Sequence, residues 1–69
     1  MTGYIDGKGR VYEVGRYASG FVWGTWRSYV SDKNLYQLIL AGHHSEADAR
    51  AALDKYAEQH GLRKVEDNG

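Results

Sequence analysis

The chain has 69 residues, no cysteine and no proline, and its nine basic side chains balance nine acidic ones. This length allows one domain, and a chain of this size buries only about 60% of the surface that its unfolded form exposes. The absence of cysteine excludes disulfides and thiolate metal sites. A membrane-spanning helix needs about 20 apolar residues, and no apolar stretch in the sequence is nearly that long. We expect one small domain over residues 1–69 that contacts no membrane and, without an export signal, is cytoplasmic.

Three stretches rich in β-branched and aromatic residues predict three strands, and the short turns between them predict hairpins. A turn signal, DGKG at residues 6–9, precedes the first strand, because Asp and Gly tolerate a positive φ. A further short strand at residues 4–5 stays open. The sequence therefore predicts an antiparallel meander of three strands at residues 10–17, 20–30 and 35–41.

The C-terminal third of the chain predicts one helix, because the period of its apolar pattern changes from two to about 3.6. Ser45 is a suitable N-cap for the segment SEADARAALDKYAEQHG, and Gly61 can end the helix in a left-handed conformation. Residues 63–69 are expected to form a frayed tail, so the core spans about residues 10–62. The apolar stripe of the helix consists of Ala49, Ala52, Leu53, Tyr56 and His60.

A meander sheet followed by one helix predicts an α+β fold, a three-stranded antiparallel meander sheet with one C-terminal helix packed on one face. One helix covers one face, so the other face stays open. Gly24 and Ser28 allow close approach of the helix, which favours a covered face of Val22, Trp26, Val30, Tyr36, Leu38 and Leu40. The open face then carries Phe21, Trp23, Thr25, Arg27 and Tyr29, flanked by Glu13, Tyr17, Gln37 and Ile39.

The inverted register of the second strand, which exchanges Trp23 for Trp26, remains an alternative. Either register leaves one tryptophan on the open face. A functional interpretation of that face therefore holds for both registers.

The open face combines aromatic side chains with single charged groups, a composition enriched at the centres of protein interfaces. We interpret it as a surface that binds a protein partner or a second copy of the chain, and a homodimer suits a small chain without covalent staples. The alternative is internal bracing, since cross-strand aromatic pairs stabilise a sheet by about 0.2–1 kcal/mol each. The predicted binding residues are Tyr17, Phe21, Trp23, Arg27 and Tyr29.

Three antiparallel strands followed by a helix that opens with SEADARAALDKYA resemble two families of small DNA-binding modules. These are the plant ethylene-response-factor domain and the N-terminal arm-binding domains of phage and transposon integrases. The resemblance covers residues 11–60 and implies that the open sheet face enters a DNA groove, with Trp23 and Arg27 at reading positions. Those families place several arginines there, whereas Arg27 is the only one here. Nucleic-acid binding through the same face is therefore the alternative function.

No arrangement typical of an enzyme or a metal site is present in the sequence. His43 and His44 precede the helix, and His60 lies about 22 Å from the helix start at 1.5 Å per residue, too far for a shared zinc ion. The GKGR stretch at residues 7–10 precedes a strand, unlike a phosphate-binding loop. We predict no catalytic residue, no metal and no cofactor. A purely structural role, or catalysis without a recognisable motif, is the third interpretation.

Overall fold

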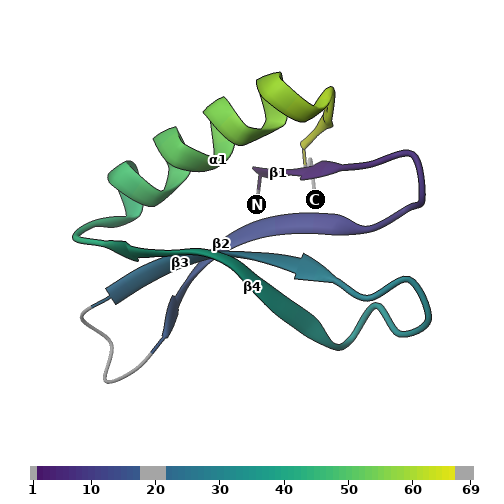
Figure 1. Cartoon of the computed structure of the whole chain (residues 1–69), viewed down its shortest axis with the longest axis horizontal. Helices are drawn as coiled ribbons and strands as arrows, with labels where there is room; N and C mark the ends of the chain where they lie inside the picture. Colours follow the sequence, from purple (N-terminus) through teal and green to yellow (C-terminus); the bar gives the residue numbers. More distant parts are fainter. Residues whose placement is uncertain (1, 18–21, 67–69) are drawn as a thin grey trace.

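The computed structural model describes residues 2–17 and 22–66, which form an antiparallel sheet and one helix (Figure 1). The strands are β1 (Thr2–Ile5), β2 (Val11–Tyr17), β3 (Val22–Ser28), β4 (Tyr36–His43) and β5 (Arg63–Glu66), and helix α1 spans Glu46–His60. The strands lie in the order β4-β3-β2-β1-β5, and each neighbouring pair is antiparallel. The predicted α+β class, with one helix against an antiparallel sheet, is confirmed.

The sheet has five strands among the described residues, so the predicted number of three is wrong. The stretch at residues 4–5 belongs to β1, and β5 forms where a frayed tail is expected. After α1, the chain turns back and pairs along β1 from Thr2↔Glu66 to Ile5↔Arg63. The short segment RKVE has only one apolar residue and gives little strand signal by itself, so its strand conformation depends on β1 beside it.

Helix α1 begins and ends where its capping residues predict. The Ser45 hydroxyl accepts a hydrogen bond from the Asp48 N–H at 3.1 Å. At the other end Gly61 has a φ of 66°, and its N–H donates to the Ala57 carbonyl. Glycine adopts this left-handed conformation without a steric cost, which explains why the helix ends here.

Few side chains are buried between α1 and the sheet, and most of them are small. Ala49, Leu53 and Ala57 form the inner side of α1, and Tyr12 and Thr25 are buried on the sheet, all with at most 2% exposure. The helix packs on β2, β3 and β4. The predicted stripe is therefore correct for Ala49 and Leu53, whereas the remaining members are half-buried or exposed.

The predicted assignment of the two sheet faces is wrong, and the inverted register is the one found. The Tyr12 ring lies 6.0 Å from the Tyr56 ring of α1, which places Tyr12 on the helix side. Tyr12 pairs with Arg27. Because directly paired residues of antiparallel strands share a face, Arg27 also lies on the helix side, and so do Thr25 and Trp23 by alternation.

Irregular pairing of β4 explains the error. Leu38 pairs with Trp26 and Leu40 pairs with Thr25, although Trp26 and Thr25 are neighbours on β3 that point to opposite faces. Leu38 and Leu40 therefore lie on opposite faces despite being two residues apart, as a β-bulge allows. Strict alternation placed Tyr36 and Leu38 under the helix, but they lie on the open face with 37% and 36% exposure.

Candidate functional site

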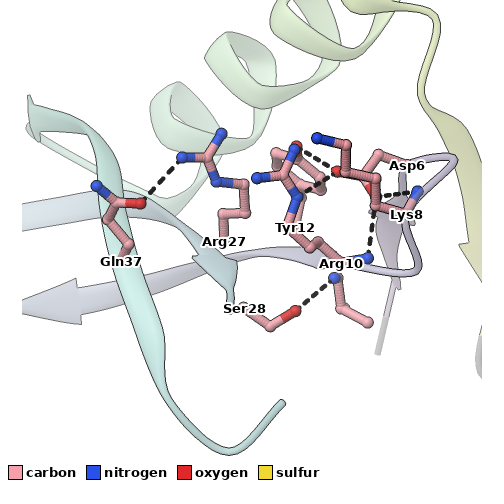
Figure 2. Close-up of polar contacts among 8 residues, drawn as sticks. Asp6, Lys8, Arg10, Tyr12, Arg27, Ser28 and Gln37 are labelled. Atoms are coloured by element: carbon pink, nitrogen blue, oxygen red, sulfur yellow. Dashed lines mark hydrogen bonds and ion pairs between the residues drawn. The ribbon is translucent and has the colours of Figure 1, made fainter. Parts of the chain in front are cut away.

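Two predicted binding residues, Trp23 and Arg27, lie on the helix side and not on the open face. The Trp23 ring centroid is 5.4 Å from the guanidinium carbon of Arg16, a distance at which a cation is attracted to an aromatic face. Arg27 donates a hydrogen bond of 2.9 Å to Oε1 of Gln37, which places Gln37 on the helix side as well. Figure 2 shows Arg27 and Gln37 on the side of the sheet that α1 covers.

Of the other predicted binding residues, Tyr29 is described in full. It follows β3 directly and is 45% exposed, in a connection where Val30 and Leu35 are also exposed. Val30 is predicted as a core residue, but 59% of it is exposed. Tyr17 ends β2, and its side chain lies outside the described part of the structure, as does the whole of Phe21.

A different set of side chains occupies the open face. Trp26 pairs with Leu38 on one side and with Glu13 on the other, so these residues form a row across three strands. Arg63 lies on the same face at the edge strand, because it pairs with Ile5 next to β2. Apart from Ile5, the described apolar side chains of this face are Val11, Val22, Trp26, Tyr36, Leu38 and Val65.

The aromatic rings of the open face lie against small residues. A Cβ atom at Gly15 would be 3.5 Å from both Cδ1 and Nε1 of Trp26, so the indole lies across this glycine. Tyr36 pairs with Ser28, whose exposure is only 1% although it faces away from α1. Burial and the nearby negative charge of Glu13 raise the pKa of Tyr36. Gly15 thus makes room for a ring, whereas Gly24 and Ser28, predicted to admit the helix, face away from it.

On the helix side, Asp6 is the centre of a polar cluster at the turn between β1 and β2 (Figure 2). Its carboxylate accepts hydrogen bonds from the Lys8 and Arg10 N–H groups at 2.9 Å, from Arg10 Nε at 2.6 Å and from the Tyr12 hydroxyl at 2.9 Å. Burial alone would raise the pKa of Asp6, but these hydrogen bonds outweigh it and hold the pKa well below its usual range. Asp6 therefore stays ionised and fixes the turn.

Tyr12 connects this cluster to Arg27. Burial and the hydrogen bond to Asp6 raise the pKa of Tyr12, and a hydrogen bond from Arg27 opposes that shift. Arg27 is also the direct cross-strand partner of Tyr12. The guanidinium groups of Arg10 and Arg27 therefore lie at the same end of the sheet, Arg10 on Asp6 and Arg27 on Gln37.

Two lysines extend this arrangement. Lys8 is exposed in the turn between β1 and β2, and Lys33 belongs to the turn between β3 and β4. The Lys33 ammonium lies over the first of these turns, since a Cβ atom at Gly9 would be 3.6 Å from its Nζ. We name the group of Lys8, Arg10, Arg27 and Lys33 the basic corner.

The structure offers no metal site within the described residues, in which no three His, Cys, Asp or Glu side chains gather. His60, considered as a metal ligand, stacks on Tyr56 with ring centroids 4.1 Å apart. An open pocket of about 400 Å³ lies beside the basic corner and is lined by Ile5, Asp6, Gly7, Gly61 and Arg63. Helix α1, the one helix in residues 2–17 and 22–66, is not long and apolar enough to cross a membrane.

The sequence contained one signal for the polar cluster. An Asp that accepts from the N–H two residues later forms an Asx turn, and the DGKG stretch has this pattern at Asp6 and Lys8. The contacts of Arg27 with Gln37 and Tyr12 depend on the strand register and had no comparable signal. Comparison of the chain with protein-family models, curated proteins and solved structures gives no significant match.

Proposed function

We propose that this chain is a small protein-binding module that associates with a second copy of itself through the open face. The observation that carries the proposal is the exposed pair of Leu38 and Tyr36 on β4, with the half-buried Trp26 beside Leu38. Leu38 and Tyr36 are 36% and 37% exposed, and Val65 at the other edge is 40% exposed. Exposed apolar groups that share one face are typical of interaction surfaces.

The size of the open face suits a dimer. Five strands about 4.8 Å apart give a face about 20 Å wide, and seven residues at about 3.4 Å each give it a length of about 24 Å. This corresponds to roughly 500 Å² in projection, and the relief of the side chains increases the accessible area. A standard interface needs about 800 Å² from each partner, so the whole face would be used.

The small core favours a partner of the same kind. Only Tyr12, Ala49, Leu53 and Ala57 are buried hydrophobic residues in the described part of the chain, so the monomer obtains little stabilisation from burial. A second copy would bury the apolar residues of both open faces at once. The face is also self-complementary in charge, because Glu13 and Arg63 carry opposite signs and a two-fold axis can bring them together.

Nucleic-acid binding through the same face, the alternative function, has less support. Arg27, the residue on which that interpretation depends, lies on the helix side. Glu13 lies on the central strand of the open face, where its negative charge would repel phosphate groups. Internal bracing by Trp26 is compatible with the proposal, because Leu38 and Tyr36 remain exposed beside a ring that lies on Gly15.

Analytical ultracentrifugation over a wide range of concentrations tests this proposal. We expect the parent chain to dimerise and Leu38→Glu to be monomeric, because a charge would be buried in the interface without a partner. Val30→Glu is the matched control, since Val30 is 59% exposed outside the open face. A parent that stays monomeric at the highest concentration, or a control that dissociates equally, would contradict the proposal.

A further inference from the structure

We propose that the basic corner is a binding site for the phosphate groups of an anionic ligand. Its two arginines lie on the helix side of the sheet, so the site is separate from the open face and does not rest on dimerisation. It consists of Lys8 and Arg10 from one turn, Arg27 from the end of β3, and Lys33 from another turn. Three segments that are distant in sequence thus contribute four positive charges to one end of the sheet.

The charges of the corner are poorly compensated. Asp6 forms an ion pair with Arg10, but among the described residues Lys8, Arg27 and Lys33 form no ion pair. Like charges repel one another. A bound anion would reduce the repulsion between Lys33 and the turn that holds Lys8 and Arg10, over which its ammonium lies.

The two guanidinium groups are held in place before any ligand arrives. Arg10 is fixed through Nε by Asp6, and Arg27 is held by its hydrogen bond to Gln37. A guanidinium has five N–H donors, so these contacts leave donors on both side chains. Arginine donors in a rigid fork match the oxygens of a phosphate, and little side-chain entropy is lost when the fork is already positioned.

The neutral net charge of the chain does not weaken this inference, because only two of the nine acidic side chains, Asp6 and Asp32, belong to the turns that carry the corner. Four of the nine lie on α1, and all four are exposed there. A local cluster of one sign attracts ligands even when the total charge is zero. These four acidic residues are Glu46, Asp48, Asp54 and Glu58.

Phosphate groups could come from a free polyphosphate or from the backbone of a single-stranded nucleic acid. The effect of a substitution at Tyr29 distinguishes these two sources. It is 45% exposed and follows Arg27 by two residues, so a nucleobase could stack on it while its phosphates contact the corner. A free polyphosphate has no base and would not depend on Tyr29.

Titrations followed by NMR of the amide groups, with pyrophosphate and with a single-stranded oligothymidylate as probes, test the site. We expect shifts of amide signals in the two turns and at the end of β3. The double variant Lys8→Gln/Lys33→Gln should bind the probe at least tenfold more weakly at low salt. For the oligonucleotide it should reduce the slope of log K against log salt by about 1.4, at about 0.7 for each phosphate contact. Both lysines are exposed, so the amide spectrum will also show that the variant folds.

The matched control is Lys55→Gln/Lys64→Gln, which removes two exposed lysines from α1 and β5. If both probes bind and Tyr29→Ser does not weaken their binding, the site is supported and phosphate groups alone are sufficient for binding. Binding of the oligonucleotide only, weakened by Tyr29→Ser, would support the site with a nucleic-acid backbone as the source. Absence of binding to both probes, or an equal loss in the control, would overturn the proposal.

Discussion

The two faces of the sheet each carry a tryptophan from β3, yet they bury their side chains in different ways. On the helix side, Thr25 is completely buried under α1, together with Leu53 of the helix. On the open face, Trp26 lies across Gly15 and is half-buried, while Leu38 and Tyr36 beside it are exposed. A strand with aromatic residues on both faces therefore need not be covered on both, since a ring can bury itself against glycine.

This difference separates stability from association. The covered face depends on a few tightly buried contacts, so changes there should act on the folded monomer. The open face contains half-exposed rings and aliphatic side chains, so changes there should act more on contacts between molecules. The variants below change residues of the covered face, of the open face or of the turn at Asp6. The stability of each variant tests this expectation.

Leu53→Ala should have the largest effect. Leu53 is 1% exposed at the centre of the helix interface, and a large-to-small change in a core costs about 2–5 kcal/mol in the free energy of unfolding. Denaturant unfolding measures the loss, which could unfold so small a domain. An unchanged midpoint would mean that α1 does not pack on this face.

Asp6→Asn should lower the free energy of unfolding by about 2–3 kcal/mol at neutral pH, because several hydrogen bonds to a charged group are weakened. The folded pKa of Asp6 lies below its unfolded value, so its stabilisation is complete above the unfolded pKa of about 3.9. That stabilisation is lost as the pH falls toward the folded pKa. The difference between parent and variant should therefore shrink in acid, and a difference independent of pH would contradict this role.

Two glycines of the open face give a sharper comparison. A Cβ atom at Gly3 would be 2.7 Å from the Tyr12 carbonyl oxygen, so Gly3→Ala must displace backbone and should cost about 1–2 kcal/mol. Gly15→Ala is the control, because its Cβ would meet Trp26 at an ordinary contact distance of 3.5 Å. Thermal melts should show a lower midpoint for Gly3→Ala only. Equal losses would mean that the ring does not lie across Gly15 as described.

Thr25→Val should have the smallest effect, and with the opposite sign. The Thr25 Oγ1 atom is buried and has no hydrogen-bond partner among the described residues. An unsatisfied buried hydroxyl costs about 1–3 kcal/mol, and valine has nearly the same shape, so the variant should gain about 1 kcal/mol of stability. Chemical denaturation of both proteins measures the gain. A loss of stability would show that the hydroxyl has a partner in solution.

The local features of the fold were predictable because their signals lie within a few residues. The cap at Ser45 and the stop at Gly61 each follow from one residue type at a helix end. Strands β2, β3 and β4 follow from alternation and turn residues. Strand β5 was not predictable, because its stability comes from pairing with β1, more than 50 residues away in sequence.

The choice of face was not predictable for a related reason. A prediction from alternation assumes that every strand keeps a period of two, and the bulge between Leu38 and Leu40 breaks that period. Gly24 and Ser28 were also ambiguous, since small residues admit either a helix or an aromatic ring. The open face therefore carries Trp26 and Leu38 where the favoured register placed Trp23 and Arg27.

The most direct test of the account is ¹⁹F NMR of the chain labelled with 5-fluorotryptophan, recorded as a function of protein concentration. The only two tryptophans lie on opposite faces, and Trp23→Phe assigns their signals. We predict that the Trp26 signal shifts as the concentration rises, while the Trp23 signal stays constant, because only Trp26 lies in the dimer interface. A shift of the Trp23 signal alone, or constant signals for both residues, would contradict the account.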